Sequence, residues 1–316
     1  MAHYIRVLLV LVGALAALPA IAEAQEQKAV LITGASSGIG RNMAETLAAE
    51  GYFVYAGARK PEDIAELSAL DNIMGVRLDV TIQEDIDAAV ELVRDEGRGL
   101  YGLVNNAGVA VLWPLIEIEE SEMDFQIDVN LMGPYRVTRA FAPLIIESKG
   151  RITTTGSISG ILSGALFGPY SISKHGVEAF TDSLAREMAQ FDVAVSVIEP
   201  GNYSSSIMDN IRGRMERRGL NYEGSRYEEQ LTSMLERMGD YSQYDSPDDV
   251  SAALVEFLAD ESPKRRYMVV PNEFQAEITV RQLLIEMVQL NEGQRYEYSR
   301  DELVAMLDEV LAESNR

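Results

Sequence analysis

The sequence predicts an α/β fold in which a parallel sheet of about seven strands is doubly wound, with helices on both faces and a helical extension at the C-terminus. Three observations support this prediction. Short apolar runs alternate with helical patterns from residue 28 to residue 270. A glycine-rich turn follows the first of these runs directly. The 316 residues, 47% of them hydrophobic, suffice for one large domain with a full core, or at most two small ones.

Composition excludes several classes of function. The formal net charge of −23 argues against nucleic acid or an anionic membrane as a partner. Such acidity keeps a surface soluble in a salty environment, although an ordinary acidic surface explains it too. Cysteine is absent, which excludes disulfides, thiolate catalysis and zinc–thiolate sites. The only histidines are His3 and His175, so a histidine-based triad or metal site is nearly excluded as well, and we expect no metal.

The first 24 residues have the pattern of a targeting segment. Arg6 gives a positive start, residues 7–18 form an apolar run, and Ala22–Ala24 offers a small-x-small cleavage site. The run is short for a membrane span and is interrupted by glycine. We therefore expect residues 1–24 to be a cleaved signal peptide and the protein to be periplasmic or secreted. An uncleaved membrane anchor, or a start codon assigned too early on a cytoplasmic protein, remains an alternative.

A strand, a glycine turn and a helix open the predicted domain. Residues Lys28–Thr33 form a short apolar run that predicts a buried strand, and the turn Gly34–Gly40 leads into a helical pattern. Glycines allow a tight turn and a close approach to a pyrophosphate, and a helix N-terminus supplies N–H groups to phosphates. A bare glycine cluster is usually only a turn. Between a strand and a helix, this one predicts a dinucleotide site.

The glycine spacing is Gly-x-x-x-Gly-x-Gly rather than the commoner Gly-x-Gly-x-x-Gly. In this it resembles the cofactor motif of the short-chain dehydrogenase/reductase family, in its shorter, single-domain branch. The resemblance covers residues 28–270 and implies a Rossmann-type domain that binds NAD or NADP and interconverts an alcohol and a carbonyl. It implies cofactor contacts at Gly34, Ser36, Ser37, Gly38, Ile39 and Gly40.

The end of the second predicted strand, Tyr52–Ala56, bears on the choice of cofactor. An NAD site usually has a carboxylate here that binds the ribose 2′-hydroxyl. This chain continues instead into Arg59 and Lys60, and an arginine can clamp a 2′-phosphate with two hydrogen bonds. We therefore expect NADP (NADPH), with NAD as the alternative. A solvated basic turn before a helix opened by Pro61 explains the same residues.

The third strand is predicted at Val76–Val80, followed by a capping box of Thr81 and Glu84 that opens a helix ending near Glu96. A fourth strand, Leu100–Val104, precedes a run of small polar residues. Such residues at a strand's carboxyl end line the ligand crevice of a doubly wound sheet. The family resemblance implies adenine contacts at the third strand's end, where a plain turn is the alternative, and cofactor contacts after the fourth: Asp79, Val80, Asn106, Ala107 and Gly108.

A tyrosine and a lysine four residues apart, Tyr170 and Lys174, share one face of a predicted helix. A phenol is a weak acid with a reference pKa of about 10, and a nearby ammonium favours its ionised form, so the tyrosine could exchange protons near neutral pH. The fifth predicted strand, Arg151–Thr155, precedes Ser157, whose hydroxyl can hold a substrate oxygen. His175 points away from Lys174 on the helix and is expected to pack.

The resemblance implies that Asn130, Ser157, Tyr170 and Lys174 form the catalytic set. Ser157 precedes Tyr170 by the thirteen residues typical of the family; Ser159 is the competing serine. In the family, the tyrosine protonates the carbonyl oxygen that receives hydride, and the lysine lowers the phenol's pKa and holds the nicotinamide ribose. Asn130, in a long helix predicted over 121–148, would bend that helix and bind a water that connects the lysine to solvent. A purely structural asparagine is the alternative.

After the sixth predicted strand, Val193–Ile198, the resemblance implies cofactor contacts at Pro200, Gly201 and, as a weaker match, Ser204. Residues 202–245 are rich in methionine and predict amphipathic helices that form a flap over the substrate cleft. A methionine-lined surface suits a bulky apolar substrate such as a steroid, retinoid or lipid alcohol. Plain core packing or a dimer contact explains these residues equally well.

A helix is predicted over Asp248–Ala259, and the seventh strand over Arg266–Val270. The C-terminal extension, 271–316, predicts helices at 275–291 and 300–313, the second opened by a capping box. It either completes the pocket or binds a partner subunit, and we expect a homo-oligomer, a dimer or a tetramer. A non-catalytic NADP-binding sensor on the same fold remains the alternative to an enzyme, although the complete catalytic set argues against it.

Overall fold

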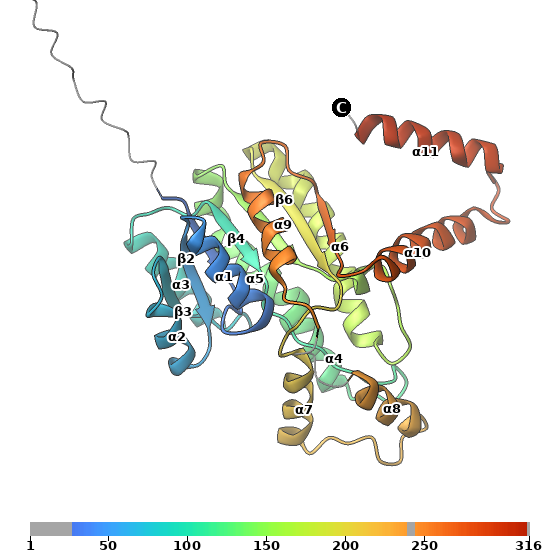
Figure 1. Cartoon of the computed structure of the whole chain (residues 1–316), viewed down its shortest axis with the longest axis horizontal. Coiled ribbons are helices and arrows are strands. Elements are labelled where there is room, and N and C mark those ends of the chain that lie inside the picture. The colour runs from blue at the N-terminus through green and yellow to red at the C-terminus, as the bar shows by residue number, and fades with distance from the viewer. Residues whose placement is uncertain (1–26, 239–243, 315–316) are drawn as a thin grey trace, which may run out of the picture.

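The protein is described here from a computed structural model, which describes residues 27–238 and 244–314. The predicted signal peptide, 1–24, and residues 239–243 of the predicted flap lie outside the described residues. Seven parallel strands form one sheet in the order β3-β2-β1-β4-β5-β6-β7 (Figure 1). This confirms the predicted fold class. The strands are β1 Ala29–Ile32, β2 Phe53–Ala58, β3 Ile73–Arg77, β4 Gly102–Asn105, β5 Arg151–Thr155, β6 Ala194–Pro200 and β7 Arg266–Val269.

From β1 the chain adds strands β2 and β3 toward one edge of the sheet, and it then returns to add β4 to β7 toward the other edge. This strand pairs with β2 through Leu31 opposite Tyr55, and with β4 through Leu31 opposite Leu103. The connections after β1 and β4 therefore leave the sheet toward opposite edges. A crevice forms at the carboxyl ends of these two strands, and this is where sheets of this topology bind ligands.

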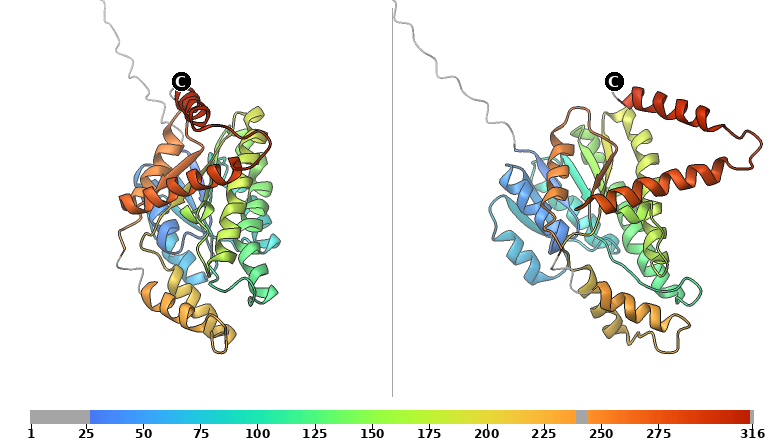
Figure 2. Two further views of the ribbon diagram at one scale, coloured as in Figure 1. Left: turned by 90° about the vertical axis from the view of Figure 1, so that its right-hand side faces the viewer. Right: turned by 45° about the vertical axis from the view of Figure 1, so that its right-hand side comes forward.

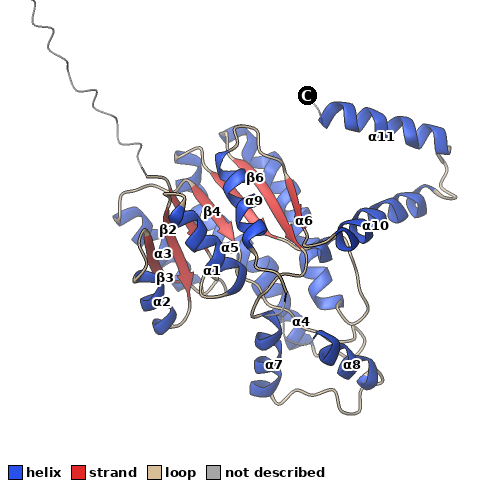
Figure 3. Cartoon of the chain, in the orientation of Figure 1, coloured by secondary structure: helices blue, strands red, loops and turns tan. Residues whose placement is uncertain are grey.

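Helices cover both faces of the sheet (Figure 3). Two buried apolar clusters, one on each face, explain why the strands read as continuous apolar runs. One face packs against α1 Gly38–Ala49, α2 Pro61–Ser68 and α9 Asp248–Ala259. The other packs against α3 Gln83–Asp95, α5 Gly133–Glu147 and α6 Gly168–Met188.

The third strand and the helix after it differ from the prediction. The strand ends at Arg77, three residues earlier than expected, because its pairing partner β2 ends at Ala58. The predicted capping box of Thr81 and Glu84 is wrong. The Thr81 hydroxyl donates to the Asp79 carboxylate at 2.7 Å, and α3 begins after Ile82 without a side-chain cap.

The long helix predicted over 121–148 is instead three joined segments. These are α4 Glu120–Ile127, a π-helical turn over Asp128–Met132, and α5. A π-turn inserts one extra residue into a helix and is frequent at functional sites. Here the turn contains Asn130, so the predicted disturbance of the helix is present at the predicted residue.

Two pairs of helices complete the chain. The first, α7 Ile207–Arg218 and α8 Glu228–Met238, lies beyond the carboxyl ends of the strands, as Figure 1 shows. The second, α10 Glu273–Asn291 and α11 Arg300–Ser314, extends away from the sheet (Figure 2). The capping box before α11 is confirmed, because the Glu302 carboxylate accepts from the backbone N–H of Ser299 at 2.8 Å and the Ser299 hydroxyl accepts from the backbone N–H of Glu302 at 3.4 Å. Within the described ranges, no helix is long and apolar enough to cross a membrane.

Candidate active site

The turn between β1 and α1 passes so close to the loop after β4 that a side chain at Gly34 would not fit. Gly34 has a left-handed backbone with φ of +67°, and a Cβ there would lie 2.8 Å from the Cα of Ala107. The next helix, α1, begins at Gly38 without a side-chain cap at Ser37. Its first N–H groups therefore remain available to an anion, and the dipole of the helix favours negative charge there. The turn thus fits the pyrophosphate of a dinucleotide.

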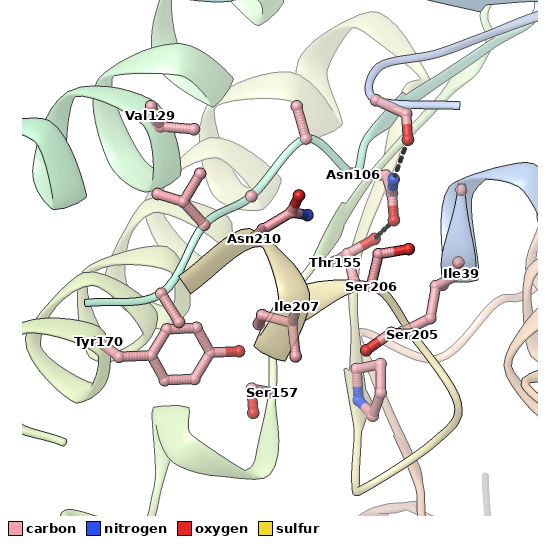
Figure 4. A pocket seen from close by; sticks show the side chains of 18 of the residues that line it. Ile39, Asn106, Val129, Thr155, Ser157, Tyr170, Ser205, Ser206, Ile207 and Asn210 are labelled. Carbon is pink, nitrogen blue, oxygen red and sulfur yellow. Dashed lines mark hydrogen bonds between the residues drawn. The ribbon is translucent and has the colours of Figure 1, made fainter. Parts of the chain in front are cut away.

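Thr33 joins the ends of β1 and β4. Its hydroxyl oxygen accepts hydrogen bonds from the backbone N–H groups of Asn106 and Ala107, both at 2.9 Å. The Asn106 amide in turn donates to the carbonyl oxygen of Thr33 at 3.0 Å. It also accepts from the Thr155 hydroxyl at 3.2 Å, a bond that Figure 4 draws. These bonds hold three strand ends in register below the crevice. The sequence prediction did not assign a role to Thr33, although it directly precedes the glycine turn.

Ser157, Tyr170 and Lys174 come together at the carboxyl end of β5. Figure 4 shows the phenol oxygen of Tyr170 turned toward Ser157, which hydrogen-bonds it. The Lys174 ammonium donates to the carbonyl oxygen of Thr155 at 2.7 Å and lies 5.6 Å from the centre of the Tyr170 ring. The competing serine, Ser159, donates its backbone N–H to the Ser157 hydroxyl at 3.1 Å.

The pKa values of the tyrosine and the lysine shift in opposite directions. Burial raises the pKa of Tyr170 above 10, and the hydrogen bond from Ser157 opposes this only in part. Burial lowers the pKa of Lys174 to about 8, although the Glu178 carboxylate opposes the change. The expected lowering of the phenol's pKa by Lys174 is therefore not seen, because burial dominates and the ammonium is bound to Thr155. At neutral pH the phenol carries a proton that it can donate.

The side chain of Asn130 forms hydrogen bonds to the backbone of the loop after β4. Its Oδ1 accepts from the N–H of Val109 at 2.8 Å, and its Nδ2 donates to the carbonyl oxygen of Val109 at 2.9 Å and to the Ser173 hydroxyl at 3.1 Å. Gln126, which the sequence prediction missed, also donates to Val109 and Ser173. Both side chains thus hold the loop after β4 against the helix that carries Tyr170. The water-binding role of Asn130 stays a prediction.

One cavity of about 830 Å³ collects nearly all the predicted site residues. Asn130 and Ser204 are the exceptions: Asn130 is not part of the lining, and Ser204 lines a smaller neighbouring pocket while Ser205 and Ser206 line the large one. The backbone N–H of Ser204 donates to the carbonyl oxygen of Asp245, which fixes the turn in this register. The predicted residues that line the large cavity are Gly34, Ser36, Ser37, Gly38, Ile39, Gly40, Arg59, Asp79, Val80, Asn106, Ala107, Gly108, Ser157, Tyr170, Lys174, Pro200 and Gly201.

Arg59 and Asp79 lie at the end of this cavity nearest β2. The Arg59 side chain is 66% exposed, and its guanidinium is 3.9 Å from the Asp79 carboxylate. Asp79 also accepts a hydrogen bond from the backbone N–H of Thr81 at 3.0 Å. This end therefore offers both a cation that suits a 2′-phosphate and a carboxylate that suits a ribose hydroxyl or the adenine.

The opposite end of the cavity is apolar. Met208 and Ile211 of α7 are buried in a small cluster with Ala110 and Leu112. Met234 of α8 packs against the same cluster. The helices predicted as a flap therefore lie against the cavity, next to Tyr170. Its apolar lining includes Leu162, Phe167, Ile207, Met208, Ile211 and Met234.

The sheet topology, the glycine turn and the crevice at the strand ends together define a dinucleotide-binding protein of the doubly wound class. The chain belongs to the short-chain dehydrogenase family, whose profile, described as "short chain dehydrogenase", matches residues 28–216. Among curated relatives it is 42% identical to the mitochondrial D-beta-hydroxybutyrate dehydrogenase of Bos taurus over 187 residues. It is 40% identical to retinol dehydrogenase 7 of Rattus norvegicus, also over 187 residues.

These matches cover 56% and 58% of this chain, and 54% and 59% of the two relatives. The chain thus aligns with little more than half the length of these relatives. Solved structures agree over more of it. A short-chain dehydrogenase from Burkholderia phymatum in complex with NAD is 26% identical, with a TM-score of 0.72, covering 87% of this chain and 97% of that one. A metagenomic short-chain oxidoreductase in complex with NADP is 28% identical, with a TM-score of 0.60, covering 78% and 97%.

Proposed function

We propose that this protein is an NADP-dependent oxidoreductase that interconverts an alcohol and a carbonyl on a bulky apolar substrate. One observation supports this above all. A single cavity joins the glycine turn at Gly34, the proton-bearing pair Tyr170 and Lys174, and the apolar surface of α7 and α8. Cofactor, proton donor and substrate can therefore meet in one cavity.

The residues divide the chemistry among them. When bound, the nicotinamide cofactor supplies or accepts the hydride. In the reducing direction, Tyr170 gives its proton to the carbonyl oxygen, and the Ser157 hydroxyl holds that oxygen by a hydrogen bond. The charge of Lys174 would favour the phenolate that remains against the effect of burial, and its ammonium would hold ribose hydroxyls of the bound cofactor. In the oxidising direction Tyr170 takes the proton back.

Support for NADP comes from Arg59, which lines the cavity at the end of β2 where a carboxylate would favour NAD. Asp79 lies near enough to compete for its charge, so NAD is the alternative cofactor. The solved relatives include one complex with each cofactor.

Support for a bulky apolar substrate comes from the lining of the cavity by α7 and α8. The two curated relatives are named for a small hydroxy acid and for retinol, respectively. A retinoid-, steroid- or lipid-like alcohol fits an apolar wall of methionine and isoleucine better than a small hydroxy acid does.

The proposal is tested by following NADPH and NADH consumption against a panel of retinoid, steroid, long-chain and short hydroxy-acid carbonyls. We expect turnover with the large apolar compounds. Tight NADPH binding without turnover on any member of the panel would instead favour a non-catalytic sensor.

We also propose that residues 1–24 are a cleaved signal peptide and that the protein is exported. The support is the basic start, apolar run and small-x-small site of the sequence. The intact mass of the native protein gives the answer: loss of this segment supports export, and a full-length chain contradicts cleavage.

The helices α10 and α11 support a further proposal, that the chain is a homo-oligomer. Large apolar or aromatic side chains on this arm are 39–78% exposed, among them Phe274, Val280, Leu283, Leu284, Ile285, Met287, Val288, Leu290, Tyr296, Tyr298, Val304, Met306 and Leu307. Together they leave on the order of 1,000 Å² to solvent, above the roughly 800 Å² that each partner buries in a standard interface.

Charge favours a second copy over a lipid surface as the occupant of this arm. The exposed face of α11 carries Asp301, Glu302, Asp308 and Glu309, and Arg300 is its only basic residue. An anionic membrane would repel such a helix. A second chain can cover the apolar residues of the arm and leave its carboxylates in water.

A further inference from the structure

Two carboxyl groups, one half-buried and one fully buried, lie behind the catalytic loop. Glu178 is on α6, one turn after Lys174, and Glu199 is the second-last residue of β6. The Glu199 residue is 2% exposed. The Oε1 atoms of both side chains are buried, and neither receives a hydrogen bond from a donor group in the described part of the chain. The two carboxyl groups lie close enough for a proton on one of them to bond to the other. Because carboxylates only accept, such a bond requires one proton between them.

The charges around this pair explain why a proton stays there. Arg266 on β7 is 3.1 Å from the Glu178 carboxylate but is also 3.0 Å from Asp182, which lies on the same helix. Arg265 is 3.8 Å from Asp182, and Arg186 acts on Asp182 as well. Lys174, one turn earlier on the same helix, is a further cation that interacts with Glu178.

A fully ionised pair would therefore place two adjacent buried charges against one shared arginine. Burial, reinforced by the Glu178 carboxylate, raises the pKa of Glu199 to about 8.

The pair also touches both halves of the active site. A Cβ on Gly156 would lie 3.3 Å from the Glu178 carboxylate, and one on Gly160 would lie 2.9 Å from it, so this side chain supports the loop that carries Ser157. Glu199 is followed directly by Pro200, which lines the cofactor cavity. The Glu178 carboxylate also raises the pKa of Lys174 against the effect of burial.

We propose that Glu178 and Glu199 share one proton and act as a positioning pair, which fixes the Ser157 loop against β6 and supplies the negative charge that keeps Lys174 protonated. The catalytic half of this proposal rests on the proposed function. The shared proton does not, because it is a property of the fold alone.

The catalytic half is tested by the pH profile of carbonyl reduction in two variants. Glu178→Gln removes the charge beside Lys174, so the alkaline limb of kcat/KM should move to lower pH by at least about half a unit. Glu199→Gln keeps the Glu178 carboxylate and donates to it, so the limb should stay in place. Equal losses of rate in both variants with an unmoved limb would show a merely structural role and overturn this half.

The shared proton is tested without activity, by thermal melting between about pH 5.5 and pH 8.5. The native state raises the pKa of Glu199 above its unfolded value near 4.5, so this group stabilises the fold at low pH and loses that contribution as pH rises to about 8. Glu199→Gln removes the titration, so its melting temperature should fall by several degrees less than that of wild type.

Glu187→Gln, the same change at an exposed position of α6, is the matched control and should follow wild type. Parallel pH dependence of wild type and Glu199→Gln would overturn the shared proton. If the melting temperature of Glu199→Gln depends less on pH than that of wild type but no substrate is found, the proposed function is contradicted and the shared proton is still supported.

Discussion

Lys174 titrates within the range in which enzymes are usually assayed. Its pKa is lowered to about 8, chiefly by burial, while the pKa of Tyr170 is raised. Reduction needs Lys174 charged and Tyr170 protonated, and of these two groups it is Lys174 that changes state near pH 8. We expect kcat/KM for reduction to be level below this pH and to fall about tenfold per unit above it. A profile that stays level to about pH 9.5 would show that the charge of Lys174 is not required.

Thr33 is the residue whose removal should cost most stability without touching the catalytic group. It is 1% exposed and accepts two backbone N–H bonds. Thr33→Val keeps the shape but leaves both partly buried donors unpaired, so the free energy of unfolding should fall by about 1–2 kcal/mol. Urea denaturation measures this. Thr232→Val, at an exposed position of α8, is the control and should change stability little.

At the residue scale, sequence reasoning located the groups whose chemistry is local. Tyr170 and Lys174 share a helix face, and Ser157 follows a strand at a fixed distance, so their meeting was predictable. Glu178 and Glu199 meet through the packing of α6 on β6, and no local spacing encodes that contact. The prediction of Ser204 as a cofactor contact was one residue off, since the next residue, Ser205, lines the large cavity. A backbone hydrogen bond from Ser204 to Asp245 fixes the turn in this register.

At the scale of elements, the junction of β2 and α2 determines which cofactor is preferred. If Arg59 binds a 2′-phosphate, Arg59→Ala should weaken NADPH binding about 10- to 100-fold, the effect of losing charged hydrogen bonds of about 1.5–3 kcal/mol. NADH binding should change little. Fluorescence titration of both cofactors makes the comparison, with Lys60→Ala as the neighbouring control cation. Equal weakening of both cofactors, or of neither, would contradict the preference for NADP.

The boundaries of the helices and strands show where tertiary contacts override the local sequence pattern. The helix Asp248–Ala259 was predicted at its observed bounds, since its apolar periodicity is strong. The capping box predicted at Thr81 is wrong because the turn after β3 brings the Asp79 carboxylate next to Thr81. The Thr81 hydroxyl donates its hydrogen bond to that carboxylate. The π-turn around Asn130 could be anticipated only as a bend, since its hydrogen-bond register depends on Val109 and Ser173.

At the scale of the whole molecule, the exposed arm of α10 and α11 predicts assembly. Leu283 and Leu290 lie two turns apart on one face of α10 and are 48% and 78% exposed. The double variant Leu283→Gln, Leu290→Gln should shift wild-type oligomers toward monomer in light scattering coupled to size exclusion. The catalytic domain should remain folded by circular dichroism. A monomeric wild-type protein at micromolar concentration would contradict the proposal.

The overall topology was predictable because alternation of strands and helices restricts the sheet to parallel, doubly wound solutions. The direction of the arm was not, because α10 packs on the domain through few residues. Gln275 provides one of these contacts, accepting from the backbone N–H of Asn202 at 2.9 Å. Much of the apolar surface of α10 beyond it is exposed, so packing within the described residues does not fix its place.

The central claim is that Tyr170 donates the proton in a carbonyl reduction performed within the cofactor cavity. Tyr170→Phe removes only the hydroxyl, so turnover should fall by at least about 10²–10³-fold while NADPH binding, followed by fluorescence titration, stays within about twofold of wild type. Turnover near the wild-type rate in this variant would contradict the claim.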